Sequence, residues 1–175
     1  MRFLNLGKAI SLSVVIVLAI LFFATNSHAQ QVIPISGKIN ATYTQQDSTV
    51  VSAADGHVMF ISVSEGTNVS LEGGFMDGAQ ATNMGFSDLT KGSGPHEGYI
   101  QFVKGDDGTM GQWQGKVTTV MSPEGTPVTT FEGNYRYIRG NGKFEGIKGS
   151  GTYRGTFTSK TEYTVEWQGD YILGK

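Results

Sequence analysis

An aromatic residue followed two positions later by glycine recurs in the second half of this 175-residue chain. The copies are Trp113/Gly115, Phe131/Gly133, Phe144/Gly146, Tyr153/Gly155 and Trp167/Gly169. On a β-strand, residues two apart lie on the same face, so each pair shares a face. Glycine weakens a strand interior and is typical of bends, bulges or crowded faces. Because strongly curved antiparallel sheets need such features in order to close, the repeat predicts a closed or nearly closed β-barrel.

Short alternating runs bounded by turn residues predict eight strands. Their expected bounds are Ile35–Gln45, Val58–Glu65, Gly74–Phe86, Gly98–Val103, Gly111–Met121, Val128–Arg139, Gly151–Ser159 and Thr161–Leu173. Short links such as Gly105–Gly108 and Ser122–Pro127 make consecutive strands antiparallel neighbours. The fold expected is therefore all-β, an eight-stranded antiparallel up-and-down β-barrel. The glycine-rich stretch Gly140–Gly149 predicts a hairpin with one short turn of helix.

The side-chain alternation predicts which face of the barrel is apolar. In the fifth, sixth and eighth expected strands, aromatic residues and glycines share one face, and polar residues share the other. The aromatic face is expected to point inward and to line a pocket for a small hydrophobic ligand. The expected ligand-binding residues are Trp113, Phe131, Tyr135, Tyr163 and Trp167. Glycines on the same face are expected to leave free volume beside these rings.

The first 29 residues differ in composition from the rest. Arg2 and Lys8 precede the charge-free apolar run 9–24, and Ser27-His28-Ala29 places small residues at the positions that a signal peptidase recognises. This pattern predicts a signal peptide, residues 1–29, and a single barrel domain, residues 30–175. The protein is then exported, to the periplasm or outside the cell, without stable membrane insertion after cleavage. An uncleaved membrane anchor is the alternative, because the apolar run is rather long.

Charge and cysteine content exclude several function classes. The chain has 13 Lys and Arg and 15 Asp and Glu, and removal of Arg2 and Lys8 leaves 11 against 15, a net charge of about −4. There is no basic stripe for nucleic acid, so no nucleic-acid partner is expected. The chain has no cysteine, which excludes disulfides, catalytic thiols and thiolate metal sites.

Three polar residues are possible members of the pocket: Asp77, His96 and Glu132. His96 and Glu97 are adjacent and would point to opposite faces of a strand, so a pair of solvated side chains is the preferred interpretation. Asp77 precedes a glycine and fits either a buried carboxylate near the barrel mouth or a turn. Glu132 is expected outside, opposite the aromatic face.

No catalytic residue and no cofactor is predicted. His57 and His96, with a carboxylate such as Asp77, lack the spacing that is typical of metal sites, so no metal is expected either. No nucleophile elbow or phosphate-binding loop is evident in the sequence.

The run Gly140-Asn-Gly-Lys-Phe-Glu-Gly-Ile-Lys-Gly149 resembles the glycine-rich GxGxFxxxxG signature of dirigent proteins. With Gly151-Thr-Tyr-Arg-Gly155 and Glu166-Trp-Gln-Gly169, it is similar to bacterial proteins of the allene oxide cyclase barrel-like superfamily. The blocks Gly94–Tyr99 and Gly73–Gly78 fit the same group. The resemblance implies a calycin-like barrel, often trimeric in plant relatives, that guides ring closure or radical coupling by confining a hydrophobic substrate. It assigns no catalytic residue in this chain.

Three functions remain open on the sequence alone. The first is an exported barrel that binds a small hydrophobic ligand and guides its cyclisation or isomerisation without a cofactor, as a monomer or as a dimer or trimer of the same chain. The second is a non-catalytic structural or interaction protein with a filled barrel. The third is a small outer-membrane barrel, which many charged and Gly/Thr positions on its would-be lipid face disfavour.

Overall fold

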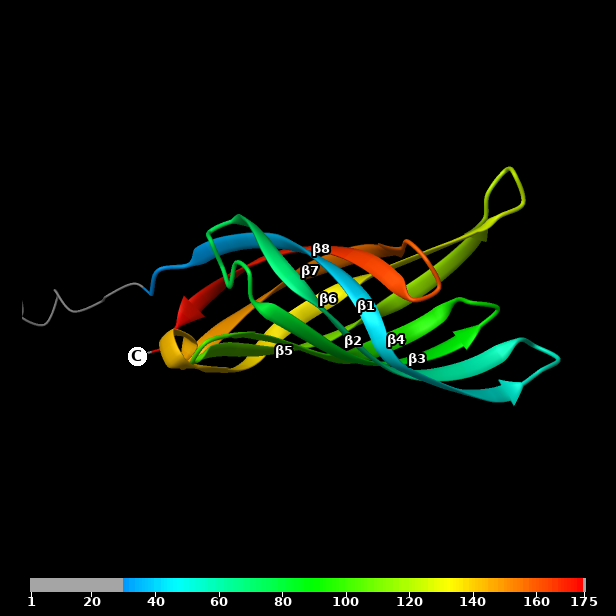
Figure 1. Cartoon of the computed structure of the whole chain (residues 1–175), viewed down its shortest axis with the longest axis horizontal. Helices are drawn as coiled ribbons and strands as arrows, with labels where there is room; N and C mark the ends of the chain where they lie inside the picture. The colour runs from blue at the N-terminus through cyan, green and yellow to red at the C-terminus, as the bar shows by residue number, and fades with distance from the viewer. Residues whose placement is uncertain (1–29, 175) are drawn as a thin grey trace, which may run out of the picture. The chain divides into compact units, whose positions relative to one another are not determined.

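The computed structural model describes residues 30–174, which form an eight-stranded antiparallel barrel (Figure 1). The elements are β1 (Ile33–Ser52), β2 (His57–Glu72), β3 (Gln80–Thr90), β4 (Gly94–Lys104), β5 (Asp107–Met121), β6 (Pro127–Asn141), a 3-10 turn η1 (Gly142–Phe144), β7 (Ile147–Phe157) and β8 (Glu162–Leu173). Each strand pairs with the next, and β8 pairs with β1 to close the barrel. The predicted fold class and strand order are confirmed. The predicted signal peptide lies outside the described residues.

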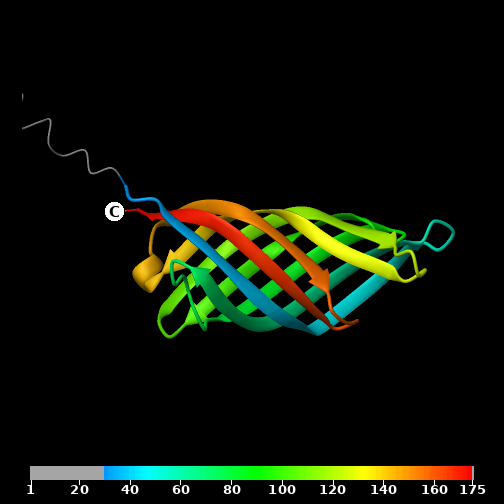
Figure 2. The same cartoon turned by 90° about the horizontal axis from the view of Figure 1, so that it is seen from above.

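The strands cross the barrel wall diagonally, as Figure 2 shows for β1 and β8. Such a tilt is required when eight strands close on themselves. Register shifts interrupt the β1–β2 ladder at Ser36/Gly37, Tyr43/Gln45 and Val50/Ser52, and the β5–β6 ladder at Met110/Gly111. Each extra residue sharpens the local bend and twist of the sheet. Within residues 30–174, no helix has the length and apolar character needed to cross a membrane.

Two hairpins extend beyond the rest of the wall at one end of the barrel (Figure 1). β1 and β2 pair out to Ser52 and His57, and β5 and β6 pair out to Met121 and Pro127. The sequence prediction ended the first strand at Gln45, because the polar run after it shows no apolar alternation. The structure shows that cross-strand hydrogen bonding continues through this run although its side chains are exposed.

The opposite end of the barrel is closed by the β2–β3 loop, residues 73–79. The sequence prediction wrongly began the third strand at Gly74, within this loop. Gly73, Gly74 and Gly78 have φ angles of 73°, 62° and 72°, and Met76 has a φ of 47°, so the chain cannot run extended here. The turn directs Phe75 and Met76 into the barrel end, where both are buried. We call residues 73–79 the plug loop.

The plug loop is held by one buried side chain of β2. The Asn68 amide donates to the carbonyl oxygens of Phe75 and Met76 at 3.0 and 3.1 Å, and its Oδ1 accepts from Trp167 Nε1 at 3.1 Å. Phe75 packs against a ring of aromatic side chains that includes Trp167 and Phe144 of η1. The short helical turn predicted within Gly140–Gly149 is present as the 3-10 turn η1, which contributes Phe144 to this cluster.

Glycines inside the barrel face aromatic rings on the neighbouring strands. Trp167 pairs with Gly37, Trp113 with Gly98, Phe131 with Gly155, Tyr135 with Gly151, and Tyr153 with Gly133. In each case a Cβ built on the glycine would collide with the opposing ring. The expectation that Gly115, Gly133 and Gly169 leave free volume is therefore wrong, since Tyr153 covers the first two and the Tyr135 hydroxyl covers the third.

Candidate functional site

The barrel encloses a cavity of about 120 Å³ between the plug loop and the hairpin end. The five aromatic residues predicted as ligand-binding all line it: Trp113, Phe131, Tyr135, Tyr163 and Trp167. They converge because β5, β6 and β8 keep strict alternation with the aromatic face inward. Other apolar wall residues come from β1, β3 and β4 and include Ile39, Ala81 and Ile100.

The aromatic walls pack mostly edge to face. The Phe131 ring lies 5.5 Å from the Tyr163 ring at 84°, and the Tyr43 ring lies 5.4 Å from that of Tyr163. Such arrangements bring the positive edge of one ring to the negative face of another and fix ring positions. The cavity wall is therefore preformed by packing among the rings.

A chain of polar side chains crosses one side of the cavity. Trp113 Nε1 donates to Asn83 Oδ1 at 2.8 Å, and Asn83 Nδ2 donates to the Tyr163 hydroxyl at 3.2 Å. The Tyr163 and Ser64 hydroxyl oxygens are 2.6 Å apart. Burial raises the pKa of Tyr163, so this hydroxyl stays protonated at neutral pH. We call Ser64, Asn83 and Tyr163 the hydroxyl–amide cluster.

His96 packs against the Trp113 ring and is 8 % exposed, so the preferred prediction of a solvated side chain is wrong. Its ring centroid is 4.8 Å from that of Trp113, and its Nε2 is 2.9 Å from the Tyr153 hydroxyl. Burial lowers the pKa of His96, and a backbone hydrogen bond with Glu132 partly opposes this effect. In the tautomer with the proton on the other ring nitrogen, the neutral ring accepts the Tyr153 hydroxyl proton at Nε2. The prediction that His96 and Glu97 point to opposite faces is confirmed.

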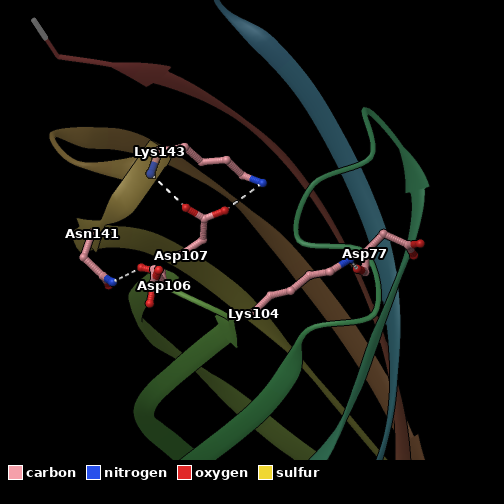
Figure 3. Close-up of polar contacts among 6 residues, drawn as sticks. All are labelled: Asp77, Lys104, Asp106, Asp107, Asn141 and Lys143. Carbon is pink, nitrogen blue, oxygen red and sulfur yellow. Dashed lines mark hydrogen bonds and ion pairs between the residues drawn. The ribbon is translucent and has the colours of Figure 1, made fainter.

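Asp77 lies away from the cavity, exposed in the plug loop (Figure 3). Its Oδ1 accepts from the Ser70 backbone N–H at 2.9 Å, and Lys104 Nζ donates to its carbonyl oxygen. Nearby, the Asp107 carboxylate accepts from both the backbone N–H and Nζ of Lys143, each at 2.9 Å. The backbone hydrogen bond is the main reason that the pKa of Asp107 is lowered. These contacts tie the plug loop to β4 and η1 to β5.

Glu132 faces outward, as the sequence favoured, and pairs with Lys116 at 3.2 Å on the exposed surface. His57 lies on β2 and its Nε2 contacts the Asp88 carboxylate. Within the described part of the chain, no three His, Cys, Asp or Glu side chains are grouped as metal ligands.

Ser64, Asn83 and Tyr153 also line the cavity, although the sequence did not predict them there. In β2 and β3 the polarity is reversed, because Ser62, Ser64 and Asn83 point inward while Ile61 and Phe86 are exposed. Alternation alone would assign the apolar set to the interior and so gives the wrong face. Tyr153 could have been predicted as a cavity residue, because it belongs to the aromatic–glycine repeat whose other strand members point inward.

Comparison with models of protein families and with curated proteins found no match to this chain. The site must therefore be interpreted from its own geometry. A preformed aromatic cavity with a few convergent polar groups is the arrangement typical of small-molecule sites.

Proposed function

We propose that this protein binds a small, largely apolar molecule inside its barrel. The supporting observation is the cavity of about 120 Å³ lined by aromatic rings and by the neutral polar groups of His96, Tyr153 and the hydroxyl–amide cluster. Aromatic walls favour an apolar body, and the few polar groups fix its orientation.

The cavity volume limits the size of the ligand. An apolar protein cavity of about 150 Å³ takes up benzene, whereas pockets for drug-sized ligands are about 300–1,000 Å³. A volume of about 120 Å³ therefore suits one ring with a short substituent. Larger polycyclic or lipid-like ligands would need wall side chains to move.

The resemblance to allene oxide cyclase barrel-like proteins extends this proposal to catalysis. Such a barrel guides cyclisation or isomerisation by holding a flexible substrate in a reactive conformation, which needs no cofactor. His96 is a buried neutral base bonded to the Tyr153 hydroxyl, so a substrate proton would reach it through that hydroxyl. Binding is the core of the proposal, and catalysis is its extension.

Export and an aqueous environment complete the proposal. The signal peptide pattern of residues 1–29 supports export to the periplasm or the medium. The outer surface of the barrel carries the ion pairs Lys116–Glu132 and Arg154–Glu166. Because a lipid-facing band needs consistently apolar positions, these charges favour a barrel in water over the outer-membrane alternative.

Ligand titration of the folded protein tests the binding proposal. Both tryptophans of the chain line the cavity, so their emission reports occupancy directly. We expect toluene or α-methylstyrene to change tryptophan emission saturably and to raise the unfolding temperature, since a ligand that binds only the folded state stabilises it.

A cavity-filling pair of variants provides the control. Ala81 lines the cavity and Thr82 is its neighbour on the outer face of β3. We expect Ala81→Leu to abolish saturable binding and Thr82→Leu to leave it unchanged, with both variants folded by circular dichroism. Equal binding by the two variants would place the ligand outside the barrel and contradict the proposal.

A second candidate function, an interaction protein, is favoured by the outer face of β2–β4. Ile61 and Phe86 are paired across the β2–β3 ladder and are 59 % and 37 % exposed, and Tyr99 on β4 is 43 % exposed. Apolar residues gathered on one face are typical of protein contacts, including a dimer or trimer of this chain. Sedimentation of the wild type and of Ile61→Glu tests self-association, which the added charge should weaken.

A further inference from the structure

The two hydroxyl groups of the hydroxyl–amide cluster carry two protons, but the cluster pairs only one of them with an acceptor. Ser64 and Tyr163 each carry one O–H, and the only hydrogen-bond partner of the Ser64 hydroxyl among the described residues is Tyr163. Asn83 Nδ2 already donates to the Tyr163 oxygen. Only one proton can lie between two hydroxyl oxygens, so the second has no protein acceptor.

The surplus proton is buried. Ser64 is 1 % exposed and Tyr163 is 6 % exposed, and both line the cavity. A buried donor without a partner is unfavourable, because its interaction with water has been lost and not replaced. The Asn83 oxygen accepts from Trp113 Nε1, and neither hydroxyl donates to it among the described residues, so it does not relieve the surplus.

The cavity wall also selects for neutral ligands. Among the described residues that line it, none is Asp, Glu, Lys or Arg. His96 is the one titratable base there, and it is buried against Trp113 and bonded to Tyr153. A charged ligand would lose its hydration without gaining a counter-charge, which is costly in an apolar site.

Resting on the proposed function, we infer that the cavity binds a neutral compound of about one ring that carries a hydrogen-bond acceptor such as a carbonyl oxygen. This acceptor receives a hydrogen bond from the unpaired O–H of the Ser64–Tyr163 pair. The aromatic walls hold the apolar body, and the hydroxyl pair orients the acceptor. Either hydroxyl can donate this hydrogen bond, because either one can donate to the other and leave the second O–H free.

Two ligands of equal shape test this inference. Acetophenone carries a carbonyl oxygen where α-methylstyrene carries a CH₂ group, so their affinities differ chiefly in hydration and in hydrogen bonding. The ratio of their dissociation constants is measured in the wild type, in Ser64→Ala, in Tyr163→Phe and in the double variant. Differences in hydration cancel when this ratio is compared between proteins.

We expect each single variant to keep the wild-type ratio, because one hydroxyl proton remains free in each. The double variant removes both hydroxyl protons, and the Asn83 amide, which has lost its Tyr163 acceptor, is then the donor left in the cluster. Acetophenone should weaken relative to α-methylstyrene by about 2- to 10-fold, because a carbonyl placed for the hydroxyl pair is not placed for that amide. The carbonyl stretching frequency of bound acetophenone should rise in the double variant alone. Both substitutions nearly conserve volume, and circular dichroism with the unfolding midpoint checks that the fold is retained.

The outcomes separate the inference from the proposed function. If neither ligand binds the wild type, the binding function itself is wrong. If both bind and the ratio and the carbonyl frequency are the same in all four proteins, the cavity binds ligands but the hydroxyl pair is not the donor. If one single variant weakened acetophenone relative to α-methylstyrene as much as the double variant does, the two hydroxyls would not share one surplus proton.

Discussion

At the residue scale, the aromatic–glycine repeat is explained by pairing between strands. Two glycines of the repeat lie opposite a large ring on the adjacent strand, Gly133 opposite Tyr153 and Gly155 opposite Phe131, and Gly37 of β1 lies opposite Trp167 in the same way. Without a Cβ on the glycine, the ring can lie flat across the neighbouring strand, a known means of stabilising curved sheets. The rings therefore form the inner lining, and the glycines make room for it.

Trp167 tests this pairing by substitution. It is 7 % exposed, packs against Phe75 and donates to Asn68, so Trp167→Ala should lower the free energy of unfolding by about 3–5 kcal/mol. Urea titration measures the loss, with the exposed Glu166→Ala as control at about 0.5 kcal/mol or less. A loss below about 1 kcal/mol for Trp167→Ala would mean that its ring is not in the core.

Gly37 provides a matched double-variant cycle. The three atoms nearest to a Cβ on Gly37 all belong to the Trp167 indole, so Gly37→Ala should cost about 1–3 kcal/mol by overpacking. In the Trp167→Ala background the same substitution should cost almost nothing, because the colliding ring is gone. Additive free energies of unfolding would show that the ring does not cover the glycine.

His96 makes the stability of the barrel depend on pH. Burial lowers its pKa in the folded state below the value of about 6.5 expected for the unfolded chain. The unfolded chain then binds a proton that the folded barrel does not, so the free energy of unfolding rises with pH. The contribution is fully present above about pH 6.5 and is lost as the pH falls below that value.

Urea unfolding at pH 7.5 and 5.5 measures this effect in the wild type and in His96→Gln. We expect the wild type to lose more stability at pH 5.5 than the variant does. His57 is present in both proteins and cancels in the comparison. The same pH dependence in both would show that His96 does not carry it.

At the element scale, the plug loop depends on one amide side chain. Asn68 is 0 % exposed and bonds two plug-loop carbonyls and Trp167 Nε1, while its own backbone N–H and C=O pair with Ala79 and Gly78. The end of β2 and the plug loop are therefore one hydrogen-bonded unit. Closure of this barrel end is a property of that unit and not of loop residues alone.

Asn68→Ala should open this end of the barrel. It leaves the Phe75 carbonyl and the Trp167 indole N–H without their partners, while the Met76 carbonyl keeps the Ala79 N–H, at a cost of about 2–3 kcal/mol in the free energy of unfolding. Amide hydrogen exchange should accelerate at Gly78 and Ala79 more than in β5 or β6. Asn40→Ala is the control, because Asn40 bonds Thr164 on the exposed surface, and it should change neither quantity appreciably.

At the scale of the whole molecule, the two barrel ends differ. One end is filled by the plug loop, Phe144 and the polar contacts of Figure 3, and the other extends into the β1–β2 and β5–β6 hairpins. The hairpin end carries exposed apolar residues, among them Val50 and Met121.

The exported form should begin at Gln30. Ser27-His28-Ala29 after a charge-free apolar run is the basis for cleavage at this point. N-terminal sequencing of the exported protein checks it. Recovery of a chain beginning near Met1 from the membrane fraction would support the alternative of an uncleaved anchor.

The sequence by itself determined the barrel and the inward face of β5, β6 and β8. Period-two alternation is a local property, and aromatic residues such as Phe131 and Trp167 mark one face clearly. Only the tertiary structure decided the burial of His96, the reversed polarity around Ser64 and Asn83, and the filling of the glycine positions. These features depend on which residues face each other across strands far apart in the chain, and a single strand's own pattern does not contain that register.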